Sequence, residues 1–280
     1  MTAKGSRYPD VIIIGAQKCA TTSFYHYLCQ HEQIIGSFKK ELHFFDNDRA
    51  YRNGSRYYQK QFPKTLQSNM LIEATPNYVY YEKVADRIAE YDFSPKFICA
   101  IRHPLKRAYS AWNMYKELKA TLWFRRTAKK NASPTNDIYN QFITGEFPTF
   151  QDSLQVELEK IIEGSTTHEP SLIARGFYLE QLSYWISKFN RDQFFFVQQE
   201  DLIFDESTIT VLEQILKFLG ISDKQSFVDQ LNLKQKNKRS YVSDEASKLS
   251  KEFEQQLMDL FSERNEGLAE MTGLHIKWLK

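Results

Sequence analysis

The sequence predicts an α/β fold in which a central parallel sheet is flanked by helices. Short apolar runs rich in β-branched and aromatic residues alternate with longer stretches of helical periodicity along the 280 residues. This alternation is typical of parallel strands joined by helical crossovers. The hydrophobic content of 42% is enough for a large core, and the net charge of +2 is too small to indicate nucleic acid binding.

Four strands and seven helices are expected in alternation. The first strand, residues 11–14, is an uninterrupted β-branched run, as in strands buried on both faces of a sheet. Further strands are expected at 70–73, 97–101 and 194–197. Helices are expected at 22–30, 82–90, 105–118, 150–163, 176–189, 209–219 and 245–271.

The segment after the first strand, GAQKCATTS at 15–23, has the composition of an anion-binding loop. Gly15 permits a sharp turn, and the N–H groups that begin the next helix favour a negative charge. Lys18 adds a cation. The spacing differs from the nucleoside-triphosphatase loop, because the lysine comes three residues after the glycine and the second glycine is missing. A structural role for Cys19 is favoured over a nucleophilic one, because a Cys-x5-Arg motif would need arginine where Tyr25 stands.

A second anion site is expected at IRHPLKRAYS, residues 101–110, again directly after a strand. Arg102 ends the strand, Pro104 suits the first turn of a helix, and Ser110 lies two helical turns further on. An arginine and a serine placed in this way can hold one phosphate from two sides. The alternative is a helix-capping arginine and a surface serine.

Together the two segments resemble the sulfotransferases that use 3′-phosphoadenosine-5′-phosphosulfate. In that family a GxxKxxTT-like loop holds the 5′-phosphosulfate, and an Arg-x7-Ser pair holds the 3′-phosphate. The segment KKELHFFD, residues 39–46, resembles the E-x-H-F-F-D segment of the heparan sulfate glucosaminyl sulfotransferase branch. EATPNYV, RGFYLEQLSYWISKF and FFFVQQEDLIFD also match, so the resemblance covers nearly the whole chain. It implies a single P-loop-like sulfotransferase domain over residues 1–280.

The resemblance implies that the chain binds 3′-phosphoadenosine-5′-phosphosulfate, releases adenosine 3′,5′-bisphosphate and uses no metal. The implied nucleotide-binding residues are Gln17, Lys18, Cys19, Ala20, Thr21, Thr22, Ser23, Arg102 and Ser110. The basic segment KNKRSY belongs to a loop at 234–243 that is expected to close over the nucleotide with Lys238, Arg239 and Ser240. Arg239 stands where the family has glycine, and a solvated surface loop is the alternative.

Three residues are expected to carry the chemistry. Lys18 is placed to neutralise the charge that builds on the bridging oxygen as its bond to sulfur breaks. An acceptor hydroxyl must lose its proton as it attacks, which makes Glu41 the expected general base. His43 would share a face with Glu41 in an extended segment, where it could orient Glu41 or the acceptor or help to stabilise the transferring sulfuryl group. The alternatives are a solvated acid beside lysines for Glu41 and a packed ring for His43.

One residue departs from the family motif, and one stretch departs from the alternation of strands and helices. The heparan sulfate branch has a lysine where this chain has Ala74, which leaves the role of Glu73 open. The stretch 119–148 combines turn-forming residues with basic ones and is a candidate acceptor lid, or else a solvated loop. Its cations suit an anionic glycan, whereas Trp123 and Phe124 suit a compact acceptor. The cations are Arg125, Arg126, Lys129 and Lys130.

The leading hypothesis is sulfuryl transfer to a hydroxyl or amine of a small metabolite or sugar. The alternative is a phosphotransferase or a protein that only binds adenosine bisphosphate, although no Mg²⁺-holding Walker-type arrangement is evident. No apolar run approaches the roughly 20 residues of a membrane-spanning helix. Three cysteines, an odd number, favour a reduced cytoplasmic setting. From the small net charge and the absence of a long apolar run, neither nucleic acid nor a membrane is expected as a partner.

Overall fold

A computed structural model describes residues 7–66, 68–119, 121, 142, 146–165, 170–202, 206–222, 227–228, 231–233 and 247–279. The chain forms two compact units. Unit 1 comprises Met1–Arg102, Leu179–Lys238 and Leu268–Ile276, and unit 2 comprises His103–Tyr178, Arg239–Gly267 and Lys277–Lys280. A single domain over residues 1–280 stays a prediction.

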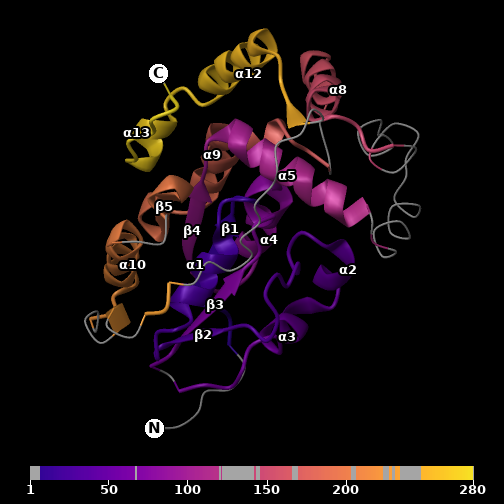
Figure 1. The fold of residues 1–280 in the computed structure, drawn as a ribbon. Coiled ribbons are helices and arrows are strands. Elements are labelled where there is room, and N and C mark those ends of the chain that lie inside the picture. Colours follow the sequence, from indigo (N-terminus) through magenta and orange to yellow (C-terminus); the bar gives the residue numbers. More distant parts are fainter. Residues whose placement is uncertain are drawn as a thin grey trace. The chain divides into compact units, whose positions relative to one another are not determined.

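Unit 1 is built on a five-stranded parallel sheet, which confirms the expected fold class (Figure 1). The strands are β1 (Val11–Gly15), β2 (Ile34–Gly36), β3 (Met70–Ala74), β4 (Lys96–Ile101) and β5 (Phe194–Gln198). Their order in the sheet is β2-β3-β1-β4-β5. The four expected strands are confirmed. The sequence did not predict β2, because a strand of three residues is too short to show a pattern.

Strand β1 lies at the centre of the sheet, where Ile12 pairs with Glu73 of β3 on one side and Phe97 of β4 on the other. All five residues of β1 are buried, which explains why the run is apolar without alternation. The strand order changes direction at β1, because β2 and β3 lie on one side of it and β4 and β5 lie on the other. Open α/β sheets bind ligands at the carboxyl ends of the strands beside such a change of direction.

The helices of unit 1 pack on the sheet or extend from its connections. They are α1 (Thr21–Leu28), α2 (Asp48–Tyr51), α3 (Gly54–Gln59), α4 (Glu82–Ala89), most of α9 (Tyr178–Lys188), α10 (Glu206–Leu219) and α13 (Leu268–Thr272). α1 packs against β1 and β3. Trp185 of α9 packs edge-to-face on Phe97 at 5.3 Å and donates a hydrogen bond to the Val79 carbonyl. Trp185 is fully buried and belongs to the core.

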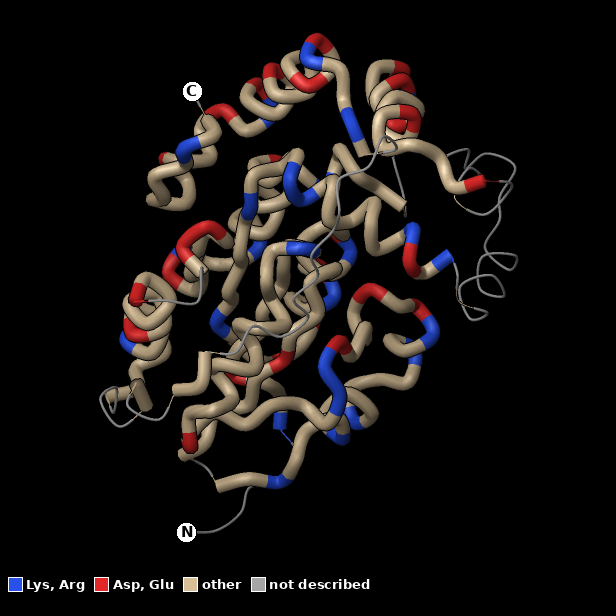
Figure 2. Tube along the Cα trace, viewed as in Figure 1, with Lys and Arg blue, Asp and Glu red and all other residues tan. Residues whose placement is uncertain are grey.

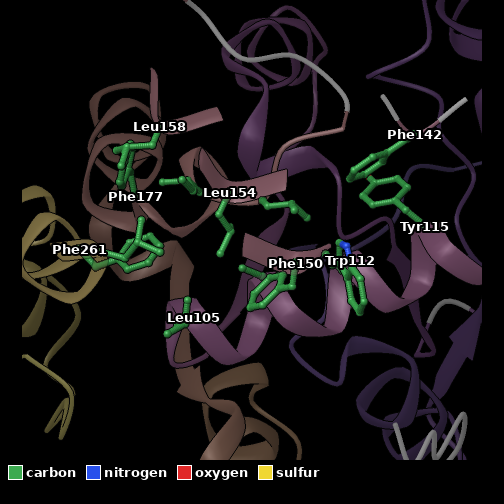
Figure 3. Close-up of a cluster of buried hydrophobic side chains, with 14 residues drawn as sticks. Leu105, Trp112, Tyr115, Phe142, Phe150, Leu154, Leu158, Phe177 and Phe261 are labelled. Carbon is green, nitrogen blue, oxygen red and sulfur yellow. The ribbon is translucent and has the colours of Figure 1, made fainter. Parts of the chain in front are cut away.

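Unit 2 is helical, and its core lies between three helices. These are α5 (Pro104–Lys119), α8 (Phe150–Ile162) and α12 (Lys251–Arg264). Figure 3 shows Phe150 of α8 close to Trp112 of α5, and Phe261 of α12 beside Phe177, with Leu154 of α8 in the same cluster. The ring contacts agree, since Trp112 lies 5.7 Å from Phe150 and Phe177 lies 5.9 Å from Phe261.

Six of the seven expected helices are confirmed with ends that differ by at most three residues. The expected helix over 245–271 is wrong. The hydroxyl of Ser250 caps α12, and this helix ends at Arg264. Gly267 has a left-handed φ of 89°, which an α-helix does not accommodate, and α13 begins only at Leu268.

Gly15 ends β1 where another chain segment comes very close. A Cβ at this position would lie 2.5 Å from Val79 Cγ1 and 3.0 Å from the Pro76 carbonyl oxygen. We therefore expect Gly15→Ala to lower the free energy of unfolding by about 1–3 kcal/mol through overpacking. Urea denaturation measures the loss.

A double-mutant cycle gives the control for this prediction. In a Val79→Ala background the closest contact is removed, so Gly15→Ala should cost less there than in the wild type. Equal costs in the two backgrounds would show that crowding against Val79 is not the reason for glycine.

Candidate functional site

The 15–23 loop follows β1 and has an unusual backbone. Lys18 and Ala20 have left-handed φ values of 70° and 60°, which residues with a side chain rarely adopt and which often occur at functional sites. Ala20 caps α1 and offers no side-chain acceptor to the first turn of the helix. The side-chain oxygen of Gln17 is buried without a hydrogen-bond partner among the described residues. A helix start of this kind, next to a lysine, suits an anion.

Backbone and side-chain hydrogen bonds join the 15–23 loop to the end of β4. Ala16 N donates to the Ala100 carbonyl at 2.7 Å, and Arg102 Nη1 donates to the Lys18 carbonyl at 3.1 Å. The structure therefore brings Lys18 and Arg102 together. Ser110 is buried on α5 in unit 2, and its pairing with Arg102 stays a prediction.

Several predicted residues lie outside the described part of the chain. They include Lys238, Arg239 and Ser240 of the predicted nucleotide-closing loop. Most of the candidate lid at 119–148 also lies outside, including Trp123, Phe124, Arg125, Arg126, Lys129 and Lys130. These assignments stay predictions.

Glu41 and His43 lie together in the loop of residues 41–46. His43 Nε2 is 3.5 Å from Glu41 Oε2, and Lys40 Nζ is 2.8 Å from Glu41 Oε1. The expected extended backbone is wrong, because Glu41 and His43 have left-handed φ values of 63° and 49°. The two side chains meet through this turn of the backbone and not by alternation along a strand.

Asp46 is a member of this cluster that the sequence analysis did not single out. Its Oδ2 atom lies 2.8 Å from His43 Nδ1 and accepts a hydrogen bond from Asn77 Nδ2 at 3.1 Å. The side chain of Asp46 is almost fully buried, whereas the side chains of Glu41 and His43 are each 42% exposed. The aspartate three residues after the histidine in HFFD was the available signal.

The charges of the pair follow from these contacts. Burial favours the neutral form of Glu41, but hydrogen bonding to His43 and the ammonium of Lys40 lower the pKa of Glu41 to about 2. Burial also opposes the charged form of His43, but hydrogen bonds with Asp46 and Glu41 raise the pKa of His43 to about 10. At neutral pH the site therefore contains an imidazolium between two carboxylates.

Glu73 is fully buried at the end of β3 and accepts hydrogen bonds from three hydroxyl groups, those of Tyr58, Thr75 and Tyr78. Burial raises the pKa of Glu73, and these hydrogen bonds partly oppose the shift. Ala74, the next residue, is buried and accepts a backbone hydrogen bond from Glu41 at 3.1 Å. Ala74 stands where the heparan sulfate branch has a lysine, and in this chain Lys40 provides a basic group beside Glu41.

Cys19 is fully buried, in agreement with the structural role that the sequence favours. Burial also raises the pKa of Cys99 and Cys29 well above the range of reactive thiols. Within the described ranges, no group of three His, Cys, Asp or Glu side chains stands ready to bind a metal. No helix among these residues is both long and apolar enough to cross a membrane.

The parallel sheet and the loop after β1 define an α/β protein of the P-loop-like fold class. A model of the sulfotransferase domain matches residues 8–266, and the chain therefore belongs to the sulfotransferase family of transferases. Mouse heparan sulfate glucosamine 3-O-sulfotransferase 5 is 27% identical over 225 residues, which cover 80% of this chain and 56% of that protein. The chain thus spans about half the length of this relative.

Two solved structures share the fold. The sulfotransferase from Alicyclobacillus acidocaldarius has a TM-score of 0.67 and 22% identity, covering 98% of this chain and all of that one. Mouse sulfotransferase SULT7A1 complexed with PAP has a TM-score of 0.53 and 14% identity, covering 95% and 86%. At these identities the comparisons support the architecture alone.

The charge state of the site leads to a titration experiment. NMR of the imidazole carbons should show one histidine, assigned by its loss in His43→Ala, with a pKa of about 10 and not the ordinary 6.5. Asp46→Asn should bring this pKa down by at least one unit, because a neutral amide no longer favours the imidazolium.

The same shift determines how stability depends on pH. Because the folded-state pKa of His43 is raised, its stabilising effect is complete below about pH 6.5 and is lost as pH rises through about 10. In urea denaturation the difference between wild type and His43→Ala should shrink over this interval. A His43 that titrates near 6.5 in the wild type would contradict the assigned cluster.

Proposed function

We propose that this chain transfers a sulfuryl group from 3′-phosphoadenosine-5′-phosphosulfate to a hydroxyl or amine of a sugar acceptor. The observation that carries the proposal is that the 15–23 loop follows β1 while the 41–46 loop is hydrogen-bonded to the end of β3, the strand next to β1. Thr75 N donates to the Ile13 carbonyl of β1, and Glu41 N donates to the Ala74 carbonyl of β3. The lysine loop and the carboxylate–imidazole pair therefore lie at the ends of two adjacent strands.

The 15–23 loop is proposed to bind the 5′-phosphosulfate end of the donor. Residues 17–23 would supply backbone N–H groups and hydroxyls, and Lys18 would neutralise the oxygen that bridges phosphorus and sulfur. Arg102 and Ser110 would bind the 3′-phosphate, and Lys238, Arg239 and Ser240 would cover it. The PAP complex of a sulfotransferase with this fold supports such a nucleotide site.

Glu41 is proposed as the base and His43 as its cationic partner. The acceptor oxygen or nitrogen forms a bond to sulfur, its proton passes to Glu41, and the electron pair of the broken S–O bond stays on the 5′-phosphate of adenosine 3′,5′-bisphosphate. Glu41 is ionised at neutral pH, as a base must be. The imidazolium of His43 is placed to attract the sulfuryl oxygens, while Asp46 keeps the ring oriented.

A sugar acceptor is favoured by the mouse relative, which is named as a heparan sulfate glucosamine sulfotransferase, and by the charge near the site. The stretch between Asp48 and Glu73 contains no acidic residue and five exposed basic ones. They are Arg49, Arg52, Arg56, Lys60 and Lys64. Figure 2 shows this excess of blue along α2, α3 and the chain that follows. An anionic sugar fits such a surface.

A cytoplasmic location of the protein stays a prediction.

The direct experiment follows labelled sulfate. Purified protein is incubated with ³⁵S-labelled 3′-phosphoadenosine-5′-phosphosulfate, excess chelator and either heparan sulfate, neutral chitooligosaccharides or 4-nitrophenol. Label should enter heparan sulfate, and Glu41→Gln should lower kcat at least about a hundred-fold because the amide is not basic. The affinity of this variant for adenosine 3′,5′-bisphosphate should be unchanged.

The outcomes of this experiment distinguish the proposed function from its alternatives. Label in 4-nitrophenol alone would overturn the sugar acceptor and keep the sulfuryl transfer. Tight bisphosphate binding without transfer to any acceptor would favour the alternative of a nucleotide-binding protein. Activity that is abolished by chelator and restored by Mg²⁺ would favour phosphoryl transfer.

The nucleotide assignment is tested by calorimetry on Arg102→Ala. If Arg102 binds the 3′-phosphate, the variant should lose at least about ten-fold in affinity for adenosine 3′,5′-bisphosphate and much less for adenosine 5′-phosphate, which lacks that group. Equal losses for the two nucleotides would show that Arg102 acts on the loop through the Lys18 carbonyl and not on the 3′-phosphate.

A further inference from the structure

The 41–46 loop has a conformation that its own sequence does not favour. Glu41 and His43 both have left-handed φ values, and neither is glycine. Such a backbone costs free energy and persists only where the surrounding structure holds it. The loop is hydrogen-bonded to the last residue of β3 and to two residues that follow this strand.

Two hydroxyl groups hold the loop backbone. Tyr78 OH accepts hydrogen bonds from Phe44 N at 3.0 Å and from Phe45 N at 3.4 Å. Thr75 Oγ1 accepts a longer one from His43 N at 3.5 Å. The N–H groups of three successive loop residues thus end on two side chains that lie just beyond β3.

Glu73 sets the direction in which these hydroxyls point. Its Oε1 atom accepts a hydrogen bond from Tyr78 OH at 2.7 Å and from Thr75 Oγ1 at 2.9 Å. A hydroxyl has a single proton, so one that donates to Glu73 presents only lone pairs to the loop. Because Glu73 is fully buried away from bulk solvent, losing these hydrogen bonds would be costly, and they hold the two hydroxyls in this orientation.

We propose that Tyr78 and Thr75, oriented by Glu73, are positioning residues that hold the catalytic pair Glu41 and His43 in its working geometry. This inference rests on the proposed function and extends it, since none of the three side chains needs to touch the donor or the acceptor. It assigns a role to Glu73, whose purpose the sequence left open. It also explains why a carboxylate is buried at the end of a central strand.

The chain offers a matched control. Tyr58 is also fully buried, and its hydroxyl also donates to Glu73, but to the Oε2 atom. Among the described residues the Tyr58 hydroxyl bonds to Glu73 alone, and it does not reach the loop backbone. Tyr78→Phe and Tyr58→Phe therefore remove the same atom and the same kind of bond to the same carboxylate, and only the first releases the loop.

The test compares these two variants with the wild type. With labelled phosphosulfate and heparan sulfate as the probe, Tyr78→Phe should lower kcat at least ten-fold and leave the Kd for adenosine 3′,5′-bisphosphate unchanged. Tyr58→Phe should stay within about two-fold of wild type in kcat. Both should lower the urea midpoint by similar amounts, so that a loss of stability alone does not account for the difference.

A second readout does not depend on activity. In Tyr78→Phe the NMR pKa of His43 should fall from about 10 toward 6.5, because a displaced loop loosens its contacts with Asp46 and Glu41, and in Tyr58→Phe it should not. If Tyr78→Phe does not fold, Thr75→Val takes its place, with Thr75→Ser as the variant that restores the hydroxyl. An inactive wild type would refute the proposed function, while the titration would still test the positioning role. Equal kcat and equal His43 pKa in the two Tyr→Phe variants would overturn the inference.

Discussion

The backbone hydrogen bonds at the carboxyl ends of β1, β3 and β4 are the constraint on which the rest of the site depends. Ala16 N bonds to the Ala100 carbonyl, Thr75 N to the Ile13 carbonyl and Glu41 N to the Ala74 carbonyl. The first two bonds tie the segments that follow β1 and β3 to the neighbouring strands β4 and β1. The third ties the 41–46 loop to the end of β3. Because β1 is fully buried and β1, β3 and β4 are each paired on both sides, these loops are held at a rigid edge of the sheet.

The chemistry follows from how charge is arranged at that edge. A cationic loop and helix start lie after β1, and a carboxylate and an imidazolium lie beside β3. Sulfuryl transfer needs a cation where the leaving oxygen gains charge and a carboxylate where the acceptor loses its proton. In the proposed mechanism, Lys18 and Glu41 meet these two needs from different loops. His43 stays charged because two carboxylates accept its N–H groups.

The sequence predicts the fold well because the strands that form the centre of the sheet have no polar alternation. It predicts Lys18, Arg102, Glu41 and His43 as site residues, and the structure brings them together in two pairs, Lys18 with Arg102 and Glu41 with His43. The left-handed backbone of the 41–46 loop could not be predicted, because residues outside the loop stabilise it. The pKa values of the pair also depend on Asp46 and Lys40, whose contacts become visible only in three dimensions.

The most direct measurement is a crystal structure of the protein with adenosine 3′,5′-bisphosphate. The 5′-phosphate should lie against the N-terminus of α1 within hydrogen-bond distance of Lys18 Nζ, with the Glu41 carboxylate facing the side from which an acceptor would attack the sulfuryl group. A nucleotide bound elsewhere, or a 5′-phosphate that does not contact Lys18, would contradict the account.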